Sequence, residues 1–243
     1  MSGRGLPLAG VTALVTGAAG GIGRALVDEL LARGAARVHA AARRDVGPWA
    51  DARVSPLVLD ITDAAAVREA AARCTGVQLL VNNAGVNRNA SLLRAPDLDA
   101  ARAEMETNYF GTLAMCRAFA PVLAGNGGGC IVNVLSIAAE AGMPPMGSLC
   151  ASKAAALRMT ECLRAELAGQ GTQVMAALPS AVDTAMTRHL DGLPKLQPAE
   201  VARAICDGIE SGQDYLLVGA PAEHIARRLR EDRAGMLAQL GGR

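Results

Sequence analysis

The segment GAAGGIG, residues 17–23, has the glycine spacing of a phosphate-binding turn. An apolar run over residues 11–16 precedes it, and residues 24–35 follow with the apolar spacing of a helix. Such glycines permit a tight turn and a close approach of the backbone to a pyrophosphate, which the first N–H groups of the helix would bind. The predicted nucleotide contacts in this turn are Gly17, Gly21, Ile22 and Gly23.

The end of the next predicted strand, residues 37–42, indicates which nucleotide is bound. A site for NAD(H) places an acid there, which binds the ribose 2′-hydroxyl. This sequence has Arg43 and Arg44 instead. A guanidinium suits a 2′-phosphate through its charge and its forked donors. We therefore expect NADP(H) rather than NAD(H), against the alternative of two solvated surface arginines.

A second candidate for a reactive side chain is Lys153. The chain has only one other lysine, Lys195. Lys153 lies on a predicted helix, and a side chain four residues earlier would share its face. That earlier residue is Leu149. A lysine in this place suggests chemistry, whereas the leucine beside it cannot donate a proton.

Short apolar strands alternate with helices along the chain. These elements must position the glycine turn, Arg43 and Lys153. Strands without polar alternation are typical of a parallel sheet that is covered on both faces. We expect one α/β domain over residues 1–243, a doubly wound parallel sheet of the Rossmann-like kind with about seven strands. The strands are predicted at 11–16, 37–42, 55–60, 77–82 and 130–136, within 172–180 before a loop, and at 214–219. The helices are predicted at 24–35, 63–73, 97–123 and 198–212, in a segment that contains Leu149 and Lys153 and runs to about Leu167, and in a last Arg-rich segment.

Composition excludes several classes of function. The chain has 51% hydrophobic residues and a formal net charge of +1, which gives no case for a nucleic acid or an acidic membrane as partner. The six cysteines form no CxxC pair and the three histidines lie far apart, so no metal site is expected. Without an apolar run of about 18 residues or an apolar leader, a cytoplasmic protein that does not span a membrane is expected.

Several segments in order resemble the short-chain dehydrogenase/reductase family over nearly the whole chain. TGAAGGIG (16–23) is similar to its TGxxxGxG turn, NNAG (82–85) to its strand-four motif, and PSAVDT (179–184) to its PGxVxT segment, with Ser180 where glycine is usual. The resemblance implies a fold and a nucleotide site like the family's. The further cofactor contacts that it implies are Asp60, Ile61, Asn83, Ala84, Gly85, Lys153, Pro179, Val182 and Thr184.

The same resemblance assigns Asn108, Ser136 and Lys153 to the active site. In the family the active helix reads YxxxK, in which lysine binds the nicotinamide ribose and lowers the pKa of the tyrosine. The tyrosine then exchanges a proton with the carbonyl oxygen as hydride moves. Here Leu149 occupies the tyrosine position. Since a positioned acid or base contributes about 10²–10⁴ in rate, the ordinary mechanism is expected to be impaired.

Other groups are candidates for the missing acid. Glu140 follows Ser136 in a loop that lines the substrate pocket in the family, His189 lies in a predicted substrate lid over residues 185–197, and Cys150 is next to Leu149. Each has a plainer alternative as a solvated or core residue, and Lys153 acting through water is a further candidate. The remaining tyrosines, Tyr109 and Tyr215, are expected to point away or to be structural.

Three functions remain open. The first is an NADP(H)-dependent reductase of a hydrophobic carbonyl, enone or imine, favoured by the retained Asn108, Ser136 and Lys153 and by an apolar wall of Met143, Pro144, Pro145, Met146 and Leu149. The second is a cyclase or isomerase on the same scaffold, and the third is an NADP(H)-binding sensor without turnover. An engineered knock-out would also place leucine at position 149.

The resemblance also implies a homodimer or homotetramer. In the family the helix that holds Asn108 and the helix that holds Lys153 pack against their symmetry mates. Ala154, Leu157, Cys162 and Ala165 would supply small and apolar contact surface there.

Overall fold

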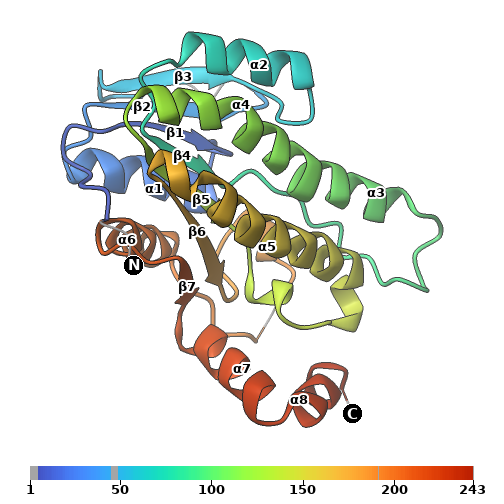
Figure 1. Cartoon of the computed structure of the whole chain (residues 1–243). Coiled ribbons are helices and arrows are strands. Elements are labelled where there is room, and N and C mark those ends of the chain that lie inside the picture. The colour runs from blue at the N-terminus through green and yellow to red at the C-terminus, as the bar shows by residue number, and fades with distance from the viewer. Residues whose placement is uncertain (1–4, 45–48, 191, 243) are drawn as a thin grey trace.

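A computed structural model describes residues 5–44, 49–190 and 192–242. The other residues of the predicted domain, among them Asp191 of the predicted lid, lie outside the described part. The described residues form a parallel sheet with the strand order β3-β2-β1-β4-β5-β6-β7, in which every pairing is parallel (Figure 1). The doubly wound architecture is therefore confirmed. The strands are β1 (Thr12–Thr16), β2 (Arg37–Ala42), β3 (Val54–Val58), β4 (Leu79–Asn82), β5 (Gly129–Val134), β6 (Thr172–Pro179) and β7 (Tyr215–Val218).

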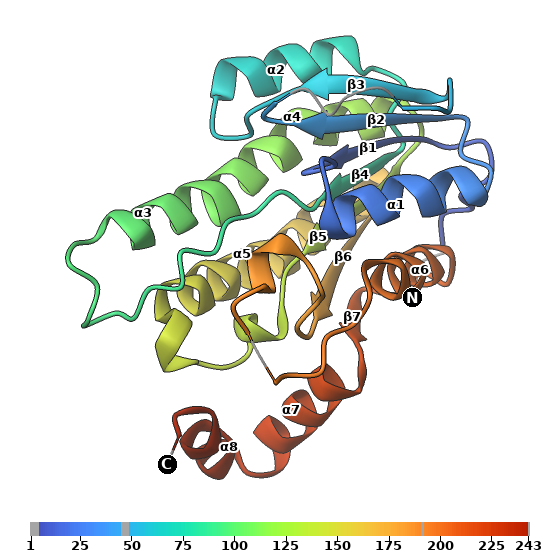
Figure 2. The same ribbon diagram turned by 180° about the vertical axis from the view of Figure 1, so that it is seen from behind.

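Helices cover both faces of this sheet. α2, α4 and α5 lie over one face, which is turned to the viewer in Figure 1, and α1 and α6 lie over the other, which is seen in Figure 2. Two β-strands, β3 and β5, end two residues earlier than predicted, at Val58 and Val134. The α-helices are α1 (Gly21–Ala32), α2 (Ala64–Arg73), α3 (Asp99–Met105), α4 (Thr112–Gly125), α5 (Gly147–Leu167), α6 (Pro198–Glu210), α7 (Ala220–Glu231) and α8 (Arg233–Leu240).

Short helical turns connect several of these elements. A π-helical segment, η1 (Glu106–Gly111), joins α3 to α4, so the single helix predicted over 97–123 is in fact interrupted. The sequence prediction assumed one uniform helical period over 97–123, whereas a π-helical turn has i→i+5 hydrogen bonds and is rare. The remaining turns are η2 (Ile137–Ala139), η3 (Pro144–Met146), η4 (Ala168–Gln170) and η5 (Ala185–Thr187).

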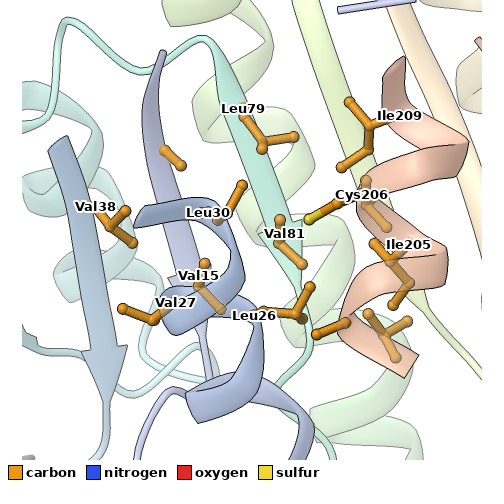
Figure 3. Close-up of a cluster of buried hydrophobic side chains, with 14 of the residues drawn as sticks. Val15, Leu26, Val27, Leu30, Val38, Leu79, Val81, Ile205, Cys206 and Ile209 are labelled. Atoms are coloured by element: carbon orange, nitrogen blue, oxygen red, sulfur yellow. The ribbon is translucent and has the colours of Figure 1, made fainter. Parts of the chain in front are cut away.

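The core consists of aliphatic side chains that alternate between the two faces of each strand. Val15 of β1 points to α1 and α6, whereas its neighbour Leu14 points to α2 and α4. Figure 3 shows the first of these layers, in which Leu26 and Leu30 of α1 and Ile205 of the neighbouring α6 pack with Val81 of the sheet. Few aromatic residues are needed, because small and branched residues fill the space between helix and sheet.

α7 and α8 form a hairpin beyond β7, at the edge of the sheet (Figures 1 and 2). Leu229 of α7 and Met236 of α8 are buried against Ala141, in the loop that follows β5. The hairpin is thus attached to the loop that connects Ser136 to α5. No helix within the described ranges combines the length and the apolar composition that a membrane span requires.

Candidate active site

The turn between β1 and α1 is packed as a phosphate-binding turn must be. Gly17 has φ +68°, and a Cβ at this position would lie 2.9 Å from Cα of Ala84. A Cβ on Gly23 would overlap the carbonyl oxygen of Gly17. α1 begins at Gly21 without a side-chain cap, so its first N–H groups stay open to an anion.

Hydrogen bonds join this turn to the end of β4. The hydroxyl of Thr16 accepts from the backbone N–H groups of Asn83 and Ala84, each at 3.0 Å. The Nδ2 of Asn83 donates to the carbonyl oxygens of Thr16, at 3.0 Å, and Gly17, at 3.3 Å. β1 and β4 are neighbours where the strand order reverses, the place at which open α/β sheets bind nucleotides. The predicted glycine turn and strand-four motif therefore meet.

The predicted adenosine end lies at the ends of β2 and β3. Arg43 is exposed, and its positive charge helps to lower the pKa of Asp60, although the main cause is the hydrogen bond from the backbone N–H of Thr62. The Oδ1 of Asp60 accepts that bond at 2.9 Å and a second from the Thr62 hydroxyl at 2.8 Å. Ile61 is buried against Gly111. A guanidinium and a fixed carboxylate are thus both present where a 2′-phosphate and an adenine would bind.

A cavity of about 650 Å³ opens beyond the glycine turn, a size that suits a small-molecule ligand. Its walls come from the carboxyl ends of β1, β4, β5 and β6, from the start of α5, from the lid and from α7 and α8. Gly23, Arg43, Asp60 and Ile61 do not line this cavity. The predicted site residues that do are Gly17, Gly21, Ile22, Asn83, Ala84, Gly85, Ser136, Leu149, Lys153, Pro179, Val182 and Thr184.

Lys153 is buried at the bottom of the cavity. Its Nζ donates to the carbonyl oxygen of Val134 at 3.0 Å, which uses one of its three N–H donors. Burial lowers the pKa of Lys153 to about 8, because the interior disfavours the charged form. Gly85 lies beside the ammonium group: a Cβ there would be in ordinary contact with Nζ, at 3.5 Å, and in tighter contact with Oδ1 of Asn108, at 3.1 Å.

Asn108 lies behind the cavity wall and does not line it. Its Oδ1 accepts from the backbone N–H of Val86 at 2.9 Å, and its Nδ2 donates to the Val86 carbonyl oxygen and to the Ser152 hydroxyl, each at 3.0 Å. The side chain thus ties the segment after β4 to α5, at the residue that precedes Lys153.

Ser136 faces the cavity from the end of β5. Its Oγ accepts a hydrogen bond from the backbone N–H of Ala138 at 3.1 Å. This bond uses a lone pair of the oxygen and leaves the O–H as a donor. Ser136 can therefore offer a hydrogen bond to an oxygen atom in the cavity.

Leu149 lies one turn before Lys153 and lines the cavity with Met143 and Met146. Pro144 and Pro145 are exposed and do not line it, so the predicted apolar wall is only partly right. Further apolar walls come from Ile137, in the loop after Ser136, and from Met186, Leu190, Leu193 and Pro194 of the predicted lid. Pro221, Ile225 and Leu240 come from a region that the sequence did not connect with the site.

The proposed replacements for tyrosine do not reach the cavity. Glu140 accepts a hydrogen bond from the Tyr215 hydroxyl at 2.8 Å, and burial together with this bond raises the pKa of Tyr215. The Sγ of Cys150 accepts from the backbone N–H of Met143 at 3.3 Å, and burial raises the pKa of its thiol. His189 is exposed on the lid. None of the three lines the cavity, since Glu140 is bonded to Tyr215, Cys150 is buried on α5 against Met143, and His189 is exposed.

The helices that the sequence assigned to an oligomer interface differ in part from expectation. Tyr109 points away from the cavity, as predicted, and lines a second groove between α4 and α5 with Met105, Leu113 and Cys162. Leu157, predicted to supply contact surface, is instead fully buried within the chain, because its face of α5 packs on the sheet.

Buried amides hold α5 in register with the sheet, a feature that motif reading missed. Nδ2 of Asn82 donates to Oδ1 of Asn133 at 2.9 Å, and Nδ2 of Asn133 donates to the hydroxyl of Thr160 at 2.9 Å. An asparagine inside the apolar run of β5 was the available signal, because a buried amide requires a partner. In the structure this chain links β4, β5 and α5.

The fold and its glycine turn define a dinucleotide-binding protein, and comparisons with known proteins define the family. Residues 11–192 match the family model for short chain dehydrogenases. A short chain dehydrogenase of Burkholderia cenocepacia, solved in complex with NADP, is 47% identical with a TM-score of 0.93, over 97% of this chain and 99% of that one. The chain belongs to the short-chain dehydrogenase/reductase family of oxidoreductases.

Two relatives of known reaction are less similar. The 1-deoxy-11-beta-hydroxypentalenate dehydrogenase of Streptomyces avermitilis is 34% identical over 231 residues, which are 87% of this chain and 86% of the relative. The 2-(R)-hydroxypropyl-CoM dehydrogenase of Xanthobacter autotrophicus is 31% identical over 206 residues, or 79% of this chain and 82% of the relative. Their substrates differ widely, so the family alone does not name the substrate of this protein.

Proposed function

We propose that the protein is an NADP(H)-dependent reductase of a hydrophobic carbonyl, enone or imine, in which the proton comes from a group other than tyrosine. The observation that carries this is the cavity at the nucleotide turn, in which Ser136 and Lys153 are present and Leu149 stands at the tyrosine position. The NADP complex of the Burkholderia relative and the exposed Arg43 support the choice of nucleotide.

The residues of this chain fit such a nucleotide. The glycine turn leaves space that a Cβ would fill, and α1 begins with open N–H groups. NADPH, when bound, supplies a hydride. Ser136 then holds the substrate oxygen through its hydroxyl, Lys153 binds the ribose, and the apolar walls exclude water, which strengthens both polar contacts.

Deuterium transfer tests this proposal. The protein is incubated with NADPH deuterated at either face of the nicotinamide C4 and with a panel of hydrophobic ketones, enones and cyclic imines. Mass spectrometry should find deuterium in at least one product, and NADH should react more slowly. A panel without deuterated product, together with tight NADPH binding by calorimetry, would favour the nucleotide-binding protein without turnover, which the leucine at position 149 also fits.

We further propose a homodimer or homotetramer formed through α4 and α5. The groove between these helices is lined by Met105, Tyr109, Leu113 and Met159, and Phe110 beside it is 50% exposed. A second copy of the chain packed on α4 and α5 would cover this groove and the exposed ring of Phe110. Light scattering at micromolar concentration should give a mass of two or four chains.

A further inference from the structure

The cavity presents one titratable side chain to its interior. Among the described residues that line it, Lys153 is the only one of the ionisable types Asp, Glu, His, Cys, Tyr, Lys and Arg. The remaining polar lining comes from hydroxyls, from the amides of Asn83 and Asn87, and from backbone groups. Few groups on the cavity wall can therefore give a proton to a substrate oxygen.

We propose that Lys153 is itself the proton donor, and that its ammonium group gives a proton to the substrate oxygen directly or through one water. The proposal rests on the proposed function, since it requires that a carbonyl or enone is reduced here. Leucine is shorter than tyrosine and has no hydroxyl, so the cavity beyond Leu149 leaves space for a substrate oxygen or a water on the side of Lys153.

The surroundings of Lys153 suit a proton donor near neutral pH. β5 presents the carbonyl oxygen of Val134, the turn after β4 presents Gly85, and η1 presents the amide of Asn108, all of which are neutral. Of the acids on neighbouring elements, Glu104 of α3 accepts from the backbone N–H of Arg88, and Asp183 after β6 is exposed. Burial without a paired carboxylate favours loss of the proton, whereas in water lysine would hold it far too strongly.

The step balances without a further reactant. The carbonyl carbon gains the hydride, the C=O π bond breaks, and its electron pair moves to the oxygen. The oxygen takes a proton from Nζ, so that an N–H bond breaks as an O–H bond forms. Lys153 becomes a neutral amine and regains its proton from solvent before the next turnover.

This assignment narrows the substrate class. A positive group at the reacting centre stabilises the negative charge that develops on a carbonyl or enolate oxygen, and it repels an iminium cation. Neutral ketones and enones should therefore be reduced faster than iminium ions of similar shape and hydrophobicity.

The small number of lysines allows a direct measurement. Protein labelled with ¹³C and ¹⁵N in lysine contains two side-chain signals, and Lys195→Arg assigns them. In the complex with NADP⁺, the Lys153 signal should titrate near pH 8. It should also shift when the alcohol that corresponds to a ketone of the panel is added. Titration at the ordinary value for lysine, about 10.4, would overturn the proposal.

Kinetics provides the second measurement. Lys153→Arg keeps a positive charge but cannot release a proton, so reduction should fall by roughly 10²–10⁴-fold while NADPH affinity changes less than about tenfold. Arg203→Lys, an exposed change on α6, is the matched control. In the wild type, reduction requires the ammonium form, so kcat should be full below pH 8 and should fall above it, and alcohol oxidation should show the opposite dependence.

The outcomes separate the two proposals. A wild-type protein that transfers no deuteride to any carbonyl contradicts the proposed function. If the wild type transfers deuteride and Lys153→Arg does so at an equal rate, only the assignment to Lys153 is contradicted.

Discussion

The nucleotide half and the substrate half of the cavity are built in different ways. The nucleotide half consists of the turns after β1 and β4, where Thr16 and Asn83 fix the backbone by four hydrogen bonds and Gly17 has no space for a side chain. The substrate half consists of the segment after β5, the lid and the α7–α8 hairpin, whose side chains are mostly Met, Leu, Ile and Pro.

The difference shows which constraints act on each half. Close backbone packing limits the residue types at the glycine turn, so these positions follow the family pattern. On the proposed function, the substrate half must only supply apolar volume and one source of protons. A change such as tyrosine to leucine at position 149 can therefore be accommodated there without disturbing the sheet.

The largest expected effect is in the nucleotide half. Gly23→Ala places a Cβ against the carbonyl oxygen of Gly17 and 2.6 Å from Nδ2 of Asn83. We expect NADPH binding to be lost in calorimetry and Tm to fall by roughly 3–10 °C, since overpacking costs about 1–3 kcal/mol. Gly125→Ala, which meets no atom within 4 Å at the end of α4, is the control and should bind NADPH normally.

The next effect concerns the substrate half. Leu149→Tyr adds a hydroxyl beside Ser136 and Lys153, so reduction of simple activated ketones with NADPH should rise by about 10²–10⁴-fold, whereas turnover of the native substrate falls. Leu149→Phe adds the ring without the hydroxyl and should only lower native turnover. If Leu149→Tyr changes neither activity, position 149 is not at the reacting centre.

A smaller effect is expected at the adenosine end. Arg43→Ala should weaken NADPH binding by roughly 10- to 100-fold, because hydrogen bonds to charged groups contribute about 1.5–3 kcal/mol. NADH has no 2′-phosphate, so its affinity should stay the same, and comparison of the two nucleotides by calorimetry serves as an internal control. Equal losses for both nucleotides would place Arg43 away from the 2′-phosphate.

The smallest effect is expected at the part of the cavity wall that α8 supplies. Leu240→Ala removes apolar contact from a half-buried side chain, which should raise KM for a bulky substrate roughly fivefold, or by about 1 kcal/mol, without a change in kcat. Gln239→Ala, an exposed neighbour, should leave both constants unchanged. A parallel fall in kcat would mean that α8 also positions the reacting group.

The residues that the sequence placed at the glycine turn and after β4 meet in the structure, whereas the walls of the substrate half were foreseen only in part. Glycine spacing and the arginine after β2 are local signals, so the turn and the residues at the strand ends could be located without a structure. The lining by Ile225 and Leu240 could not, because an apolar helix stripe shows that a face is covered but not what covers it. Glu140 and His189 were misjudged for a related reason, since spacing does not fix the direction of a side chain on a loop.

The α7–α8 hairpin has one more consequence, for how the substrate range of this protein could change. It follows the edge strand β7, and the pairings among the other six strands do not depend on it. Pro221, Ile225 and Leu240 nevertheless supply part of the cavity wall. A recombination event that replaced residues 220–240 would therefore exchange one wall of the cavity and leave the nucleotide turn intact. Specificity and cofactor use can diverge independently in such an architecture.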